Sequence, residues 1–193
     1  MPDKALPFPN RELADTELSY DYCYGKIPPE DRAEIVESAW NKGVEAAKVV
    51  YDRYQGSCDF FHILKKSGLT CVKVDTDYVM GNRRYFSDYL TGRARVQLFM
   101  KSIALWAAEN GIGVDEAANM ILSHEYFHFL EHTEIGLTSR EYQVPILIFG
   151  KLKLGRTGIR ALSEIGAHAF AWTYHALVAA NRKEGEPNEK QTL

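Results

Sequence analysis

Apolar residues recur at helical spacing in three long parts of the chain. In residues 30–56, apolar side chains such as Ile35 and Ala39 return every three or four positions, a period that predicts an amphipathic helix. Two further stretches with this period cover Val114–Thr133 and about Thr157–Asn181. The first two begin with acidic residues, which favours helix N-termini because the helix dipole is positive there.

Between the first and second of these helices, the pattern changes from helical spacing to alternation. A short helix is predicted at Asp59–Lys66, followed by a strand at Leu69–Val74. Two more strands are predicted at Tyr85–Leu90 and Arg95–Met100, on either side of the turn signal Thr91-Gly92. The order of elements predicts an α+β fold with a small, mostly antiparallel sheet.

The length and composition favour one compact domain. The chain has 193 residues, of which 46% are hydrophobic, enough for one sizeable core. Residues 1–29 are rich in proline and tyrosine, so we expect an extended arm rather than a helix. The single domain is expected at 30–182, and the charged residues 183–193 are expected to form a disordered tail.

Charge and cysteine usage exclude several classes of function. The formal net charge is -3, with acids and bases interspersed, so neither nucleic acid nor a membrane is an expected partner. The first ten residues hold three prolines and no apolar run, which predicts no secretory signal and a cytoplasmic protein. Cys23, Cys58 and Cys71 share no metal-binding spacing and are interpreted as reduced thiols.

Candidate chemistry lies in the second helix, where residues 124–128 read H-E-Y-F-H. Residues four apart lie on the same face of a helix, so His124 and His128 present their imidazoles to one point. Such a pair binds zinc, which lowers the pKa of a bound water to about 7. Glu125 is displaced around the helix and can accept the proton of that water as a general base.

A third ligand is needed, and the sequence offers three candidates. His132 lies one further turn along the same helix, too far to share one tetrahedral centre comfortably. Glu134 has the spacing of the third ligand in metzincins, but the glycine that lets their chain turn back is replaced by Glu131. Glu164 is the strongest candidate, because it begins an inward-facing row with His168 on the last long helix.

With these residues, the chain resembles the ImmA/IrrE family of gluzincin-like metallopeptidases. In that family, HExxH is followed on a later helix by a Glu-x-x-Ala-x-x-Phe-Ala segment, and here residues 164–171 read E-I-G-A-H-A-F-A. The resemblance covers about residues 58–181. It implies a zincin-like fold, in which the sheet packs against the HExxH helix and a C-terminal helix carries the third ligand.

The resemblance also implies roles for individual residues. His124, His128 and Glu164 become the zinc ligands, and Glu125 becomes the base. The strand at Arg95–Met100 becomes the edge along which a peptide substrate adds as an extra strand. The implied activity is zinc-dependent hydrolysis of a peptide bond in a protein partner, and a transcriptional regulator is the first substrate to test.

Three positions depart from the family pattern. Phe127 replaces the usual glycine before the second histidine, and Gly166 and His168 replace an acidic residue and an asparagine. His168 is a candidate catalytic residue that either orients a ligand or stabilises an oxyanion. Competitors for the oxyanion role, which the sequence does not rank, are His175, Tyr126, Tyr142 and Tyr174.

An alternative function remains open from the sequence. The protein is then a regulatory or binding module, in which zinc is a structural brace or the cleft is blocked. The aromatic arm, with Tyr20, Tyr22 and Tyr24, motivates this reading, since an arm across the cleft would autoinhibit the site. The two readings differ in whether the fourth metal position is open to water.

Overall fold

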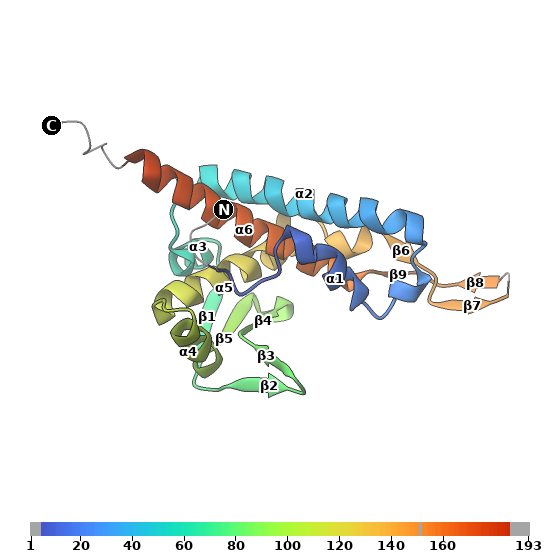
Figure 1. The fold of residues 1–193 in the computed structure, drawn as a ribbon, viewed down its shortest axis with the longest axis horizontal. Coiled ribbons are helices and arrows are strands. Elements are labelled where there is room, and N and C mark those ends of the chain that lie inside the picture. The colour runs from blue at the N-terminus through green and yellow to red at the C-terminus, as the bar shows by residue number, and fades with distance from the viewer. Residues whose placement is uncertain (1–4, 151, 186–193) are drawn as a thin grey trace.

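Two long helices lie side by side along the molecule, and the other elements pack around them. The computed structural model describes residues 5–150 and 152–185. Helices α2 (Pro29–Arg53) and α6 (Arg160–Gly185) pack along each other, and α5 (Val114–Leu130) packs against α6. Figure 1 shows these helices as successive layers, with the sheet below α5. This arrangement confirms the α+β class.

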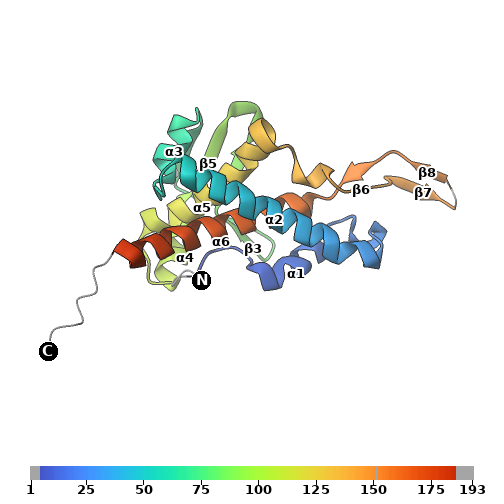
Figure 2. The ribbon, with the colours of Figure 1, turned by 90° about the horizontal axis from the view of Figure 1, so that it is seen from above.

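The smaller elements surround α5 and the ends of α6, as Figure 2 shows from above. Helices α3 (Phe60–Lys66) and α4 (Met100–Glu109) both pack on α5. The remaining elements are α1 (Ala14–Ser19), β1 (Thr70–Val74), β2 (Tyr78–Met80), β3 (Arg83–Tyr85), β4 (Ser87–Leu90), β5 (Arg95–Phe99), β6 (Gln143–Val144), β7 (Leu147–Phe149), β8 (Leu152–Leu154) and β9 (Thr157–Gly158).

The main sheet is mixed, which corrects the mostly antiparallel prediction. Its strand order is β1-β5-β4, with β1 parallel and β4 antiparallel to β5. The prediction that Arg95–Met100 forms the sheet edge is wrong as well, because β5 is the central strand. Val96 and Leu98 of β5 are fully buried, and a strand with buried side chains is stabilised by neighbours on both sides. The edge strands are β1 and β4.

The N-terminal arm is partly helical, so the extended backbone predicted for residues 1–29 is wrong for residues 11–26. A 3₁₀ turn (Arg11–Leu13) is capped by the Asn10 side chain and leads into α1, and a second 3₁₀ turn follows at Tyr24–Lys26. Ala14 and Leu18, four residues apart, are 1% exposed. Burial of this apolar pair in the core between α2 and α6 outweighs the proline-rich composition.

Glycines allow α2 and α6 to approach closely. A Cβ atom at Gly43 of α2 would lie 2.1 Å from the carbonyl oxygen of Gly166 on α6, so only glycine fits there. A Cβ at Gly166 would lie 2.7 Å from the Phe127 ring of α5 and 3.4 Å from the carbonyl oxygen of Ala39 on α2. Phe127 and Gly166, two departures from the family pattern, are therefore in contact, and the bulk of one fills the space left by the other.

The predicted helices and their ends agree with the structure to within a few residues. The predicted helix Val114–Thr133 ends as an α-helix at Leu130 and continues as a π-helical turn, Glu131–Ile135. Residues 183–185 belong to α6, and the rest of the predicted tail, 186–193, lies outside the described residues. The three cysteines are free. None of the helices in the described ranges combines the length and apolar character needed to cross a membrane.

Candidate metal site

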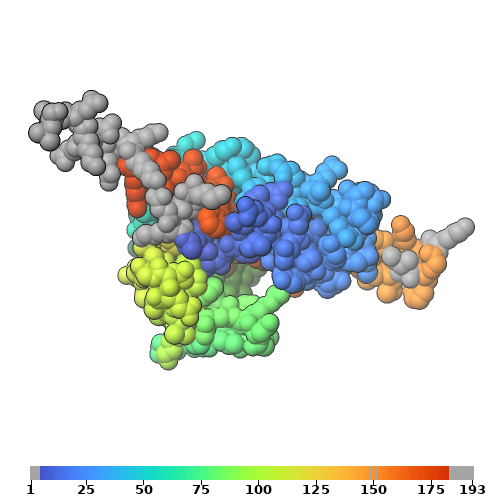
Figure 3. Space-filling model, viewed as in Figure 1, coloured from blue at the N-terminus to red at the C-terminus, as the bar shows by residue number. Residues whose placement is uncertain are grey.

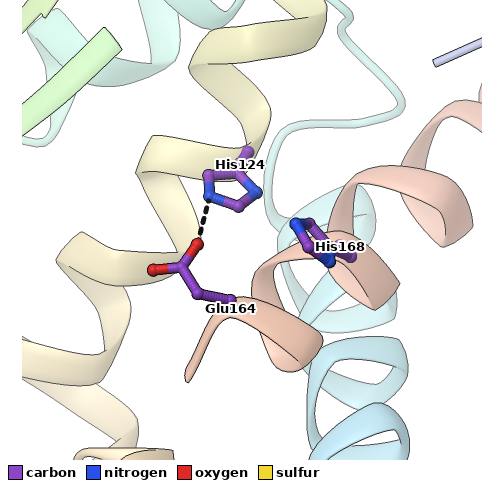
Figure 4. Close-up of side chains that lie close together, drawn as sticks. All are labelled: His124, Glu164 and His168. Atoms are coloured by element: carbon purple, nitrogen blue, oxygen red, sulfur yellow. Dashed lines mark ion pairs between the residues drawn. The ribbon is translucent and has the colours of Figure 1, made fainter. Parts of the chain in front are cut away.

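The helices α5 and α6 bring the three expected ligands together. His124 Nε2 lies 3.2 Å from His128 Nε2 and 3.3 Å from Glu164 Oε2, and His128 Nε2 lies 3.7 Å from Glu164 Oε1. Figure 4 shows the Glu164 carboxylate pointing from α6 toward the His124 ring on α5. One turn of α5 and one turn of α6 therefore form the cluster, as the i, i+4 spacing predicts.

These separations fit a tetrahedral ion. Donors about 2.0–2.1 Å from a four-coordinate zinc lie about 3.3–3.4 Å from each other, close to the 3.2 Å between the two histidine nitrogens and the 3.3 Å from His124 Nε2 to Glu164 Oε2. The distance of 3.7 Å from His128 Nε2 is to the other carboxylate oxygen, Oε1. His124 is 6% exposed, and its Nδ1 is buried without a hydrogen-bond partner among the described residues. The ring therefore makes its polar contacts through Nε2, the nitrogen that faces the other two donors. The two imidazoles and one carboxylate are a donor set that zinc prefers.

A buried carboxylate, Glu131, orients His128. Glu131 is 3% exposed, and its Oε2 lies 3.0 Å from His128 Nδ1. Its Oε1 accepts hydrogen bonds from the Thr138 backbone N–H and the Ser163 hydroxyl, both at 2.8 Å. Such a contact favours a proton on Nδ1, so that Nε2 is the nitrogen that would bind a metal after releasing its own proton.

Opposite charges shift the pKa values of His128 and Glu164. Burial alone would lower the pKa of His128, but the carboxylates of Glu164 and Glu131 raise it well above its usual value. Burial alone would raise the pKa of Glu164, yet His128 and His124 hold it well below the usual value. Because its pKa is low, the Glu164 carboxylate is ionised. The Glu164 side chain is also 45% exposed, so one side of the cluster faces solvent.

Glu125 lies beside the cluster and is held by the edge strand β4. Its side chain is buried, and Oε1 accepts a hydrogen bond of 2.6 Å from the Ser87 hydroxyl. Tyr89 lies on the same strand, and its pKa is raised by burial and by the nearby Glu125 carboxylate. The carboxylate is thus held toward β4, close enough to His128 to help raise the pKa of that imidazole.

His168 joins the cluster from α6. One donor atom from each of His124, Glu164 and His168 lies within 4.8 Å of the other two. Figure 4 shows the His168 ring on the helix that carries Glu164. Burial and the nearby His124 imidazole lower the pKa of His168 to about 3. His168 is therefore neutral at physiological pH, with one N–H donor and one lone pair.

The N-terminal arm covers this cluster through Phe8. The Phe8 ring stacks on His124 with a centroid distance of 4.5 Å and on His168 at 5.7 Å. Trp172 Nε1 donates to the carbonyl oxygens of Phe8 and Pro9 at 3.2 and 3.0 Å. From α1, Glu17 also approaches, since burial and the Glu164 carboxylate raise its pKa. Figure 3 shows the arm lying over the helices on this face.

The other candidates from the sequence lie elsewhere. Glu134 forms a two-bond ion pair with Arg53, which leaves the metzincin arrangement unsupported. His132 packs near Tyr89 rather than in the cluster. The competitors for the oxyanion role bond to other groups, namely His175 to Ser123, Tyr126 to Ser67, Tyr142 to Asp31 and Tyr174 to the Ser57 carbonyl. The arm tyrosines Tyr20 and Tyr22 are mostly exposed.

Three residues of the site, namely Glu131, Ser87 and Phe8, were not predicted from the sequence. Glu131 follows His128 by three residues, so the i, i+3 rule would have placed both on one helix face. Ser87 and Phe8 carry no such local signal, because each reaches the site only through the folded arrangement of β4 and the arm.

Comparison with known proteins identifies neither a family nor a function for this chain. The chain matches no protein-family model, and neither a curated protein nor a solved structure matches it.

Proposed function

We propose that the protein is a zinc-dependent metallopeptidase. The observation that carries the proposal is the cluster of His124, His128 and Glu164, in which the Nε2 atoms lie 3.2 Å apart and each lies 3.3 or 3.7 Å from a carboxylate oxygen of Glu164. Glu125 is buried, and its carboxylate is close enough to His128 to help raise the pKa of that imidazole. A chance pair of core histidines would account for neither the third donor nor the adjacent carboxylate.

Each residue has a role in this reaction. His124, His128 and Glu164 would hold a zinc ion, which when bound would supply a Lewis acid and a water of lowered pKa. Glu125 accepts the proton of the attacking water and passes it to the leaving amine, while the Ser87 hydroxyl keeps the carboxylate in place. His168 is neutral, and its N–H donates to the oxyanion that forms on the scissile carbonyl.

The substrate is a peptide segment of a protein partner. The β4 edge is the strand nearest Glu125, and among the described residues it pairs only with β5. An extended peptide added along β4 would pass over the zinc ligands. The resemblance to the ImmA/IrrE family makes a transcriptional regulator in the cytoplasm the first partner to test, and the zincin-like fold is part of the same proposal.

The test compares Glu125→Gln with the matched control Glu109→Gln, whose carboxylate lies at the exposed end of α4. We expect Glu125→Gln to retain zinc and to lose peptide hydrolysis by at least about 10²-fold. The control should keep both properties. Unchanged hydrolysis in Glu125→Gln, or wild-type protein without zinc, would refute the proposed function.

A second candidate function has its own observation. Phe8 stacks on His124 and His168, and Trp172 anchors the arm, so the arm can gate access to the cluster or keep it as a non-catalytic zinc module. The test is Phe8→Ala, with Phe61→Ala as a control away from the cluster. A gate predicts faster zinc loss to a chelator and faster hydrolysis in Phe8→Ala. A non-catalytic module predicts faster zinc loss without any hydrolysis.

A further inference from the structure

A hairpin projects from the end of the molecule and presents an apolar face. Strands β7 and β8 pair antiparallel, and both views show them extending beyond the end of α2. Leu147 pairs with Leu154 and Phe149 with Leu152, so all four side chains lie on one face. These side chains are between 45% and 65% exposed. A cluster of large apolar side chains left in water marks an interaction surface.

The hairpin and its flanks are also strongly cationic. Residues 142–163 contain no Asp or Glu but four basic residues, in a chain whose net charge is -3. Of these, Lys153, Arg156 and Arg160 are exposed. None of the three forms an ion pair with another described residue. The positive charge is therefore available to a partner.

A pocket at the base of the hairpin concentrates this charge. Its volume is about 390 Å³, and Lys26, Lys153 and Arg156 contribute cationic groups to its lining. Lys26 Nζ donates to the carbonyl oxygens of Pro145 and Ile146 at 3.1 and 2.6 Å, which ties the start of the hairpin to the arm. The pocket thus offers an anion a cationic lining at the base of the hairpin, and Lys153 lies on the face of the hairpin opposite the four apolar side chains.

We propose that the hairpin docks onto an anionic lipid bilayer. The face formed by Leu147, Phe149, Leu152 and Leu154 enters the boundary between headgroups and acyl chains. Lys153 on the opposite face and Arg156 at the base of the hairpin extend their charged groups to the lipid phosphates. The sequence predicted no membrane partner because charge is mixed along the chain as a whole, but residues 142–163 depart from that mixture.

A second copy of the chain fits this apolar face less well than a lipid bilayer does. The four side chains present on the order of 400 Å² of apolar surface, about half of the 800 Å² that each partner buries in a stable dimer. The unpaired cations would also face each other across a two-fold interface. Lipid docking does not depend on the metal site, so each proposal can fail without the other.

The test is cosedimentation of the full-length protein with vesicles. Vesicles of phosphatidylcholine with about one third phosphatidylserine should bind the protein at 0.1 M salt, and binding should fall at 0.5 M salt. Phosphatidylcholine alone should bind it at least about tenfold more weakly. Millimolar inorganic phosphate should not displace the protein from vesicles, which separates a bilayer from a free phosphate as the ligand.

Matched variants separate the hairpin from the general surface. Lys153→Gln should lower the partition coefficient about fivefold, and Phe149→Ser by at least that factor. The controls Lys65→Gln, on α3, and Leu105→Ser, 44% exposed on α4, should bind like wild type. Leu152→Ser replaces Phe149→Ser if the latter does not fold.

Three results would overturn the proposal. These are the absence of binding to anionic vesicles, an equal loss of binding in the control variants, and displacement by inorganic phosphate. A dimer in light scattering that Phe149→Ser dissociates, without vesicle binding by the wild type, would instead make a second copy the occupant.

Discussion

Replacing Glu131 by glutamine tests how the second histidine is oriented. In the structure, Glu131 accepts from the Thr138 N–H and the Ser163 hydroxyl through Oε1, while Oε2 contacts His128 Nδ1. Glutamine can keep the first two bonds only by turning its NH₂ group toward His128. That group is a donor, so Nδ1 must become the acceptor and the proton moves to Nε2. The nitrogen that faces the metal position then has no free lone pair.

The expected loss follows from this change of tautomer. Removing the carboxylate partner of a metal-binding histidine lowers metal affinity about 10- to 100-fold, or about 1.4–2.7 kcal/mol. We expect the upper part of this range for Glu131→Gln. The carboxylate is 3% exposed, and a buried partner is poorly replaced by water.

The assay is a zinc titration in competition with a chromogenic chelator, on metal-free protein. Glu134→Gln is the matched control, since it makes the same chemical change at a carboxylate that pairs with Arg53 outside the cluster. The control should bind zinc as the wild type does. A Glu131→Gln affinity within threefold of wild type would show that this contact does not orient the ligand.

Three further outcomes are expected. Gly166→Ala places a Cβ 2.7 Å from the Phe127 ring and should lower the free energy of unfolding by about 1–3 kcal/mol in urea titrations; Phe127→Leu in the same chain should recover part of this loss. Ser87→Ala removes the bond to Glu125 and should lower kcat about tenfold at constant zinc content. His168→Ala should lower kcat about 10²-fold with zinc affinity unchanged, whereas weaker zinc binding would make His168 a ligand.

The helical part of the fold was predictable because its signals are local. The period of apolar residues predicted α2, α5 and α6. The i, i+4 spacing predicted that His124 and His128 lie on one face of α5. Glu164 was identified because it stands in an inward-facing row of α6 and matches a family segment. In each case, the relevant residues lie within a few turns of one helix.

The remaining features depend on contacts between distant parts of the chain. The predictions of a mostly antiparallel sheet and of Arg95–Met100 as its edge were wrong because alternation identifies strands but not their neighbours, and β5 lies between β1 and β4 only in the folded sheet. The arm was expected to be extended, yet the burial of Leu18 favours a helix. Phe8 reaches His124 across more than a hundred residues, a contact for which the sequence carries no local signal.

Metal analysis of the purified protein tests the central claim, a zinc site shared by α5 and α6, most directly. Wild-type protein prepared without added metal should contain about one zinc per chain, and His128→Ala and Glu164→Ala should each lose most of it. The control Glu109→Gln should keep its zinc. A wild type without zinc, or a Glu164→Ala variant that binds zinc as tightly as the wild type, would contradict the two-helix site.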